Sequence, residues 1–330
     1  MRVVITGATG NLGSSLVERL SREPSVSEIV ALSRRPGNLP VDKVRWHGAD
    51  ISISDLEPHL RGADAVIHTA WVVQPSHDEQ QLWRVNVEGS ARVFAAAAKA
   101  GVGALIHASS VGAYSPGPKE PVDESWPTGG VVSSWYSRHK AYCERLLDGV
   151  ERDHPEIRVV RMRPSLFFKA EAATGIRKLF IGPLLPSTLV HPGRVPITPA
   201  ISGLTVQAAH TSDVTEAFRL ALLDGSARGA YNVASGPVLD SSVLSEVLGG
   251  PRVPVPAFVA KVGAALSWRA RLQPTSPDWL DLALQSPLLD TTRAETELGW
   301  KPAVSGPDAL RELLGGLAER REYPTPALRA

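Results

Sequence analysis

The sequence is short of cysteine, of net charge and of long apolar runs. One cysteine, Cys143, cannot form a disulfide within the chain, and it fits a reducing compartment. Lysine and arginine number 35 against 34 acidic residues, a balance that argues against a nucleic-acid or charged-membrane partner. No basic leader precedes the first strand, and no run approaches the roughly 20 apolar residues of a membrane span. We therefore expect a cytoplasmic protein with a small-molecule partner, no nucleic acid and no membrane.

The first residues carry a glycine motif. Residues 2–6 (RVVIT) are typical of a buried strand, and residues 14–20 have an amphipathic helical pattern. Between them, Gly7, Gly10 and Gly13 are spaced GxxGxxG. In this context Gly7 permits a tight turn, Gly10 admits a pyrophosphate near the backbone, and Gly13 lets the helix pack on the strand. The alternative is a glycine-rich turn without a ligand.

Strand and helix patterns alternate through the first half of the chain. This alternation predicts an α/β fold, a Rossmann-type doubly wound parallel sheet with helices on both faces. We expect further strands at 28–33, 44–47, 64–70, 104–109 and 157–163, helices at 85–100 and 134–150, and a return to the sheet through 213–223 and 230–234.

After Pro164 the chain becomes rich in proline and glycine, which predicts a smaller, interleaved part. The expected dinucleotide-binding part is 1–165, rejoined by about 208–235 and 286–295; the substrate-binding lid is 166–207 and 236–320; a frayed tail is 321–330.

A tyrosine and a lysine supply the strongest catalytic signal. Tyr136 and Lys140 are four residues apart, so on a helix they share one face. An ammonium beside a phenol lowers the phenol's pKa, which suits Tyr136 to proton transfer. Ser109 and Ser110 end a predicted strand, at the sheet edge where ligands bind, and can hydrogen-bond a substrate oxygen. The alternatives are an ordinary i,i+4 pair and a serine that caps the next helix.

The end of the second strand bears on the choice of cofactor. A carboxylate at this place holds the ribose 2′-hydroxyl of NAD, but the chain has Ser33, Arg34 and Arg35 instead. Two guanidinium groups suit a 2′-phosphate. We therefore favour NADP(H), with NAD(H) left open, over two arginines that merely face solvent.

Together these motifs resemble the extended short-chain dehydrogenase/reductase family, of the NAD-dependent epimerase/dehydratase type, from Met1 to about Leu314. The motifs that carry the resemblance are TGATGNLG, Asp50-Ile51, His68-Thr69-Ala70, Asn86, Ser109-Ser110 with Tyr114, Tyr136 with Lys140, Arg163-Pro164, His210-Thr211-Ser212-Asp213-Val214, Tyr231-Asn232-Val233 and Leu298-Gly299-Trp300-Lys301-Pro302.

The resemblance implies roles for individual residues. Ser110 would hold the substrate oxygen, Tyr136 would be the general acid or base, and Lys140 would bind the nicotinamide ribose and lower the tyrosine pKa. The implied cofactor positions are Gly7, Thr9, Gly10, Asn11, Leu12, Gly13, Ser33, Arg34, Arg35, Asp50, Ile51, His68, Thr69, Ala70, Asn86, Ser109, Tyr136, Lys140, Pro164, Ser165 and Leu166. Candidate substrate contacts are Trp71, Ser110, Val111, Glu124, Phe167 and Phe168. The histidines lack the spacing of metal ligands, so no metal is expected.

The stretch after Arg163 departs from the sugar-nucleotide members of the resembled family, because it lacks their asparagine and nearby Gly-Pro. An apolar wall would better match a hydrophobic ketone or alcohol, unless its members form the lid core: Phe167, Phe168, Phe180, Leu184 and Leu185. Trp268, Trp279 and Trp300 are interpreted as lid packing.

We therefore expect an NADP(H)-dependent oxidoreductase that interconverts a ketone and a secondary alcohol through Ser110, Tyr136 and Lys140. One alternative is a sugar-nucleotide epimerase or dehydratase with retained NAD⁺, whose diphosphate would be gripped by Arg177, Lys178, Arg194 and Arg252. Another is a catalytically silent cofactor sensor on the same fold. The resemblance also allows a homodimer through the helix that contains Phe94 and the helix that contains Tyr136.

Overall fold

The computed structural model describes residues 1–74, 76–181, 193 and 195–329. Its largest sheet has seven parallel strands in the order β11-β7-β5-β4-β1-β2-β3, which confirms the Rossmann-type fold. The order reverses between β1 and β4, and ligands bind beyond the carboxyl ends of strands at such a point. The strands are β1 (Arg2–Thr6), β2 (Glu28–Ser33), β3 (Val44–Gly48), β4 (Ala65–His68), β5 (Ala104–Ala108), β7 (Arg158–Pro164) and β11 (Gly229–Val233).

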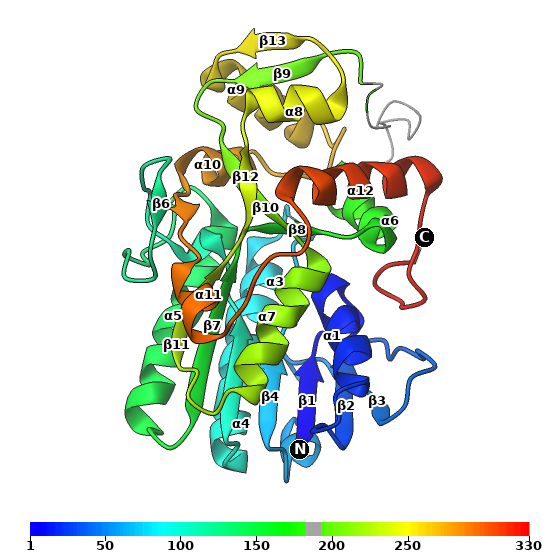
Figure 1. Ribbon diagram of the computed structural model, residues 1–330, viewed down its shortest axis with the longest axis vertical. Helices are drawn as coiled ribbons and strands as arrows, with labels where there is room; N and C mark the ends of the chain where they lie inside the picture. Colours follow the sequence, from blue (N-terminus) through cyan, green and yellow to red (C-terminus); the bar gives the residue numbers. More distant parts are fainter. Residues whose placement is uncertain (75, 182–192, 194, 330) are drawn as a thin grey trace.

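Helices cover both faces of this sheet (Figure 1). Side chains alternate along a strand, so Val3 and Ile5 join the core beside α1 and α7, and Val4 joins the core beside α4 and α5. Cys143 is buried in this second core. The helices are α1 (Asn11–Ser21), α2 (Glu57–Leu60), α3 (Glu79–Trp83), α4 (Gly89–Ala100), α5 (Trp135–Asp153), α7 (Thr211–Leu223) and α11 (Thr292–Glu297). A π-helical turn, η1 (Arg84–Glu88), joins α3 to α4.

A second group of elements lies beyond one end of the large sheet (Figure 1). Its centre is a three-stranded sheet in the order β12-β10-β8, against which α12 packs. Its strands are β8 (Leu166–Phe168), β10 (Val206–His210) and β12 (Ser235–Leu239). Two further strand pairs are β9 (Thr198–Ile201) with β13 (Arg252–Val255) and β6 (Pro121–Val122) with β14 (Leu288–Leu289). The helices are α6 (Ala173–Ile176), α8 (Ser241–Leu248), α9 (Ala257–Arg269), α10 (Asp278–Gln285) and α12 (Gly306–Glu319), and the short turns are η2 (Val111–Ala113), η3 (Ala170–Ala172) and η4 (Arg177–Ile181).

The segment after α12 is packed, so the expectation of a frayed tail is wrong. Tyr323 and Leu328 are buried and join the core beside α1. Thr325 is also buried, and its hydroxyl donates a hydrogen bond of 2.8 Å to the carbonyl oxygen of Thr9. These anchors compensate for the lost conformational freedom of the segment, since apolar burial and a buried hydrogen bond both stabilise it.

No helix among the described residues is long and apolar enough to cross a membrane.

Candidate active site

The glycine loop joins β1 to α1 in the conformation that the motif predicts. Gly7 has a φ of +72°, which suits a residue without a side chain, and a Cβ on Gly13 would lie 2.2 Å from the carbonyl oxygen of Gly7. Gly10 is the N-cap of α1, and no side chain caps the first turn. The amide groups and the positive end of the helix dipole therefore face outward, an arrangement that suits phosphate.

A pocket of about 150 Å³ opens beside this loop. It gathers predicted cofactor residues from the ends of β1, β2, β3 and β4, together with residues that the sequence did not indicate, such as Val72 and Ala327. The pocket is lined by Gly7, Thr9, Gly10, Leu32, Ser33, Arg34, Arg35, Ala49, Asp50, Ile51, Thr69, Ala70, Trp71, Val72, Val85 and Ala327.

Two residues predicted to bind cofactor are instead fully buried behind the pocket. The ring nitrogens of His68 lie 2.6 Å from the hydroxyl of Thr6 and 2.8 Å from that of Ser90, and burial lowers its pKa to about 3. Asn86 bonds through its amide group to both the N–H and the C=O of Val72, each at 2.8 Å. Neither side chain reaches the crevice, so His68 and Asn86 hold the loop after β4 in place.

Other predicted cofactor residues lie around the pocket without lining it. Ser109 donates a hydrogen bond of 2.6 Å to Glu144, and the amide of Ser165 donates one of 2.9 Å to Val233. Ser165 follows Pro164, the last residue of β7, and Leu166 begins β8. The remaining members of this group belong to α1: Asn11, Leu12 and Gly13.

Tyr136 lies in the first turn of α5, whose N-cap, Ser134, accepts a hydrogen bond from an amide of that turn. Burial raises the pKa of Tyr136 to about 12, and a hydrogen bond with the Ser110 side chain acts in the opposite direction. The amide of Gly112 donates a hydrogen bond of 3.0 Å to the Ser110 hydroxyl. Ser110 and Tyr136 thus meet as predicted, and the phenol is protonated at neutral pH.

Lys140 shares the helix face of Tyr136, but its ammonium group points elsewhere than expected. The Nζ atom donates a hydrogen bond of 2.7 Å to the carbonyl oxygen of Ala108 and lies 3.5 Å from the Trp71 ring centroid. Burial lowers the pKa of Lys140 to about 7. The expectation that Lys140 lowers the Tyr136 pKa is not met here, because burial dominates and the pKa is raised.

Aromatic rings surround Tyr136 on several sides. The ring of Trp279, from α10, lies 4.7 Å away between centroids, that of Trp71 5.8 Å away, and that of Trp135 6.0 Å away. Phe180 packs edge-on against Trp279 at 5.1 Å. The interpretation of Trp279 as lid packing therefore misses its contact with Tyr136. The residues next to Trp279 in the sequence do not indicate this contact, because it joins two residues that are 143 positions apart.

The other two tryptophans interpreted as lid packing lie elsewhere. The indole N–H of Trp300 donates to the carbonyl oxygen of Asp213 at 2.8 Å in the core. Trp268 donates to the hydroxyl of Ser76 at 2.9 Å.

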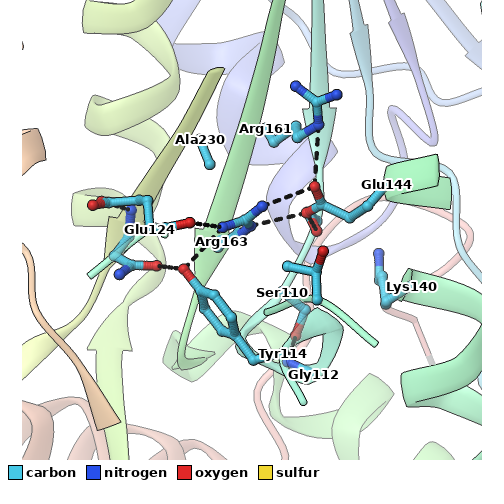
Figure 2. A network of polar contacts seen from close by, with 12 residues as sticks. Ser110, Gly112, Tyr114, Glu124, Lys140, Glu144, Arg161, Arg163 and Ala230 are labelled. Carbon is cyan, nitrogen blue, oxygen red and sulfur yellow. Dashed lines mark hydrogen bonds and ion pairs between the residues drawn. The ribbon is translucent and has the colours of Figure 1, made fainter. Parts of the chain in front are cut away.

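A buried polar network stiffens the strand ends beside the site (Figure 2). Glu144 accepts two hydrogen bonds of 2.9 Å from Arg163 and pairs with Arg161 at 3.1 Å. Burial raises the pKa of Glu144, but these arginine contacts outweigh it and leave the pKa below its usual value. Arg163 also donates a hydrogen bond of 3.0 Å to the hydroxyl of Tyr114, which donates one of 2.7 Å to Asn232. The network ties β7 to α5, η2 and β11.

A family model of the NAD dependent epimerase/dehydratase family matches residues 3–234 of the chain. The chain belongs to this family. An uncharacterized protein of Mycobacterium bovis is 26% identical over 94% of the chain, and the chain spans 29% of that relative's length. A 4-hydroxy-2-methyl-3-oxo-4-farnesyl-3,4-dihydroquinoline-1-oxide ketoreductase of Stigmatella aurantiaca is 27% identical over 94% of this chain and 96% of its own.

The fold is also shared with a dTDP-glucose 4,6-dehydratase from Streptomyces venezuelae, whose crystal structure has NAD and TYD bound. The TM-score is 0.70 at 22% identity, over 97% of this chain and 98% of that one. At this identity the likeness concerns the fold alone.

Three of the residues expected to contact substrate do not line the pocket described above. Phe167 is partly buried against the core of the large sheet, and Phe168 is partly buried in a lid cluster with Leu313 of α12. Phe168 therefore belongs to the lid core, as the alternative interpretation had it, and Phe167 does not. Glu124 accepts a hydrogen bond of 2.8 Å from the amide of Asn232 and lies across Arg163 from Lys140 (Figure 2). Leu184 and Leu185 lie outside the described residues.

Besides Ser110, two further expected substrate contacts, Trp71 and Val111, lie near Ser110 and Tyr136. Trp71 lines the pocket and meets Tyr136 edge-on. Val111, in η2, packs against a small core that includes Tyr114. Among the described residues, no cluster of histidine, cysteine or acidic side chains could hold a metal ion.

Proposed function

We propose that the chain is an NADP(H)-dependent oxidoreductase that interconverts a ketone and a secondary alcohol. The aromatic enclosure of Tyr136 by Trp71, Trp135 and Trp279 carries this proposal, because such walls favour an apolar, flat substrate. The family membership and the ketoreductase name of the Stigmatella relative agree with it.

The residues at the site fit a dinucleotide. The uncapped first turn of α1 suits the pyrophosphate, and the pocket between Arg34, Asp50 and Ile51 suits the adenosine part. When bound, the nicotinamide would supply or accept the hydride. Lys140, whose ammonium group lies against the ring of the pocket-lining Trp71, would hold the nicotinamide ribose.

Ser110 and Tyr136 do the proton chemistry in this proposal. Their hydroxyls, already hydrogen-bonded to each other, would hold the carbonyl oxygen between them. Because the phenol of Tyr136 is protonated at neutral pH, it can donate its proton to the oxygen in the reducing direction. In the oxidising direction the same oxygen would return the proton to Tyr136.

The preference for NADP(H) rests on the end of β2. Arg34 and Arg35 are exposed and line the pocket, while the Ser33 hydroxyl donates a hydrogen bond of 2.7 Å to the carbonyl oxygen of Arg35. The nearby carboxylate of Asp50 accepts hydrogen bonds from the amide and hydroxyl of Ser52 at 2.9 and 2.6 Å. Guanidinium groups beside a ribose favour a 2′-phosphate.

A sugar-nucleotide epimerase or dehydratase with retained NAD⁺ is the second candidate, favoured by the family and by the fold shared with a dTDP-glucose 4,6-dehydratase. The lid residues expected to grip a diphosphate support it less. Lys178 donates a hydrogen bond of 2.7 Å to the carbonyl oxygen of Arg329, and Arg194 lies outside the described residues.

One experiment separates the two candidates. The freshly purified protein is denatured and its released nucleotide is identified by mass spectrometry, and NADPH and NADH are then titrated calorimetrically into the native protein. We expect no retained cofactor and at least tenfold tighter binding of NADPH, a preference that Arg34→Ala with Arg35→Ala abolishes. Stoichiometric NAD⁺ would overturn the proposal in favour of the epimerase or dehydratase.

A further inference from the structure

We propose that residues 323–329, here called the strap, form a wall of the cofactor site and couple its adenosine end to the substrate lid. The inference rests on the proposed function, because it presupposes a dinucleotide. In Figure 1 the segment descends from α12 and passes close to α1.

The first contact joins the strap to the glycine loop. Thr325 is fully buried, and its hydroxyl donates a hydrogen bond of 2.8 Å to the carbonyl oxygen of Thr9. Thr9 directly precedes Gly10, the N-cap of α1. The same peptide carries the amide of Gly10, which donates a hydrogen bond of 3.0 Å to the carbonyl oxygen of Gly7. Thr325 thus holds a peptide of the glycine loop from its other side and is a positioning residue for the loop that would hold the phosphates.

The second contact places the strap beside the expected 2′-phosphate. Ala327 lines the pocket that Ser33, Arg34 and Asp50 also line. A guanidinium nitrogen of Arg35 lies 3.5 Å from the carbonyl oxygen of Pro326. The small side chain of Ala327 therefore sets the room left for adenosine, and the strap backbone orients one of the two arginines that favour NADP(H).

The third set of contacts joins the strap region to the lid. The amide and hydroxyl of Thr174, in α6, donate to the carbonyl oxygen of Arg321 at 3.3 and 2.8 Å, and Lys178 donates to that of Arg329. A Cβ on Gly175 would lie 3.0 Å from a methyl group of Leu328. The strap therefore contacts residues 175–178 through Leu328 and Arg329, and Thr174 binds the residue Arg321 just before it.

Residues 173–181 lead directly to the catalytic tyrosine. Phe180, in η4, packs against Trp279, which covers Tyr136. Gln74, in the loop after β4, donates a hydrogen bond of 2.8 Å to the carbonyl oxygen of Leu179. A dinucleotide that orders the strap would therefore order the substrate side of the pocket as well, and the coupling would be reciprocal.

Two variants test this inference. Thr325→Val keeps the shape of the side chain and removes the hydrogen bond, and Ala327→Tyr fills the adenosine end of the pocket without touching the Thr9 contact. Thr296→Val is the matched control, because the exposed Thr296 hydroxyl donates to the carbonyl oxygens of Thr292 and Arg293 of its own helix, α11. The readouts are the NADPH dissociation constant from calorimetry and amide hydrogen exchange of 173–181 with and without NADPH.

In the wild type we expect NADPH to slow exchange both in the strap and in 173–181. Thr325→Val should weaken NADPH binding about five- to tenfold, the loss of about one hydrogen bond, and should reduce the protection of 173–181. Ala327→Tyr should weaken binding at least tenfold while the melting temperature stays unchanged, and Thr296→Val should match the wild type.

Contrary results have distinct meanings. Variants that bind NADPH within twofold of the wild type and keep the protection of 173–181 would overturn the strap's role while leaving the proposed function intact. A wild type that binds no dinucleotide would overturn the proposed function itself.

Discussion

The ammonium group of Lys140 lies 3.5 Å from the centroid of the Trp71 indole ring. A ring face attracts a cation, so Trp71 partly offsets the removal of Lys140 from water. Burial nevertheless lowers the pKa of Lys140 to about 7, which places its loss of charge within the physiological range. The charge that would hold the nicotinamide ribose is therefore sensitive to pH.

The first prediction follows from this titration. The cationic form of Lys140 is present below its pKa of about 7 and is lost above it. Since an anionic cofactor favours the cation, we expect the NADPH dissociation constant to rise between pH 7 and pH 9, by up to about tenfold per pH unit. Calorimetric titrations across this range provide the measurement.

Lys140→Met is the matched variant, since it keeps the length and apolar packing of the side chain. It should bind NADPH more weakly and with little pH dependence over the same range. If the wild-type and Lys140→Met curves run parallel, the titrating group lies elsewhere.

The second prediction concerns Tyr136. Tyr136→Phe removes the proposed proton donor and keeps the ring that contacts Trp279. Turnover of apolar aromatic ketones, followed by NADPH absorbance, should fall by about 10²- to 10⁴-fold, the usual contribution of general acid catalysis. NADPH binding should stay within about threefold of the wild type. Retention of more than a tenth of the activity would show that another group supplies the proton.

The third prediction concerns the buried pair of Glu144 and Arg163. Glu144→Gln leaves Arg163 buried without its carboxylate, whereas Arg161 keeps Asp148 and Glu151. Loss of one partner of a buried pair costs about 3–5 kcal/mol. Denaturant unfolding should show this loss. Asp153→Asn, at the exposed pair with Arg152, is the control and should leave the unfolding free energy unchanged. An equal effect of the two variants would contradict the account of the network.

The fourth prediction concerns acid stability. Burial lowers the pKa of His68 to about 3 from an ordinary value near 6.5. Its contribution to stability is thus complete above about pH 6.5 and is lost as the pH falls toward 3, because the unfolded chain takes up the proton first. Over this range the loss is about 1.4 kcal/mol per pH unit for this residue.

Urea denaturation at pH 6 and pH 4.5 measures that slope. His68→Asn cannot be protonated, so its unfolding free energy should fall less steeply with acid than that of the wild type. Identical slopes in the two proteins would mean that other groups cause the acid sensitivity.

Several parts of the site follow from neighbouring residues alone. The GxxGxxG spacing predicts the turn at Gly7 and the close packing at Gly13, because backbone conformation over a few residues depends on those residues. The helix after the turn begins at Asn11, three residues before the predicted pattern at 14–20. A spacing of four predicts that Tyr136 and Lys140 share a face of α5, since the helix has 3.6 residues per turn. The alternation of strand and helix patterns along the chain predicts the parallel sheet, because a helix between two strands brings the chain back in the same direction.

Side-chain partners distant in the chain could not be predicted in this way. Trp279 covers Tyr136, Glu124 turns toward Asn232, and Thr325 reaches Thr9 across 316 residues. Each of these contacts depends on how separate elements pack. The residues next to Trp279, Glu124 or Thr325 in the sequence would look the same if that side chain faced solvent. The orientation of the Lys140 ammonium is decided likewise, by Ala108 and Trp71.

The chain's local patterns were therefore enough to predict the parallel sheet, the glycine turn after β1 and the shared helix face of Tyr136 and Lys140. Packing alone settled the aromatic enclosure of Tyr136, the burial of residues 323–329 and the direction of the Lys140 charge. The physical reason is range: turns and helix faces arise from interactions within a few residues, whereas burial and pKa depend on groups that only the folded chain brings together.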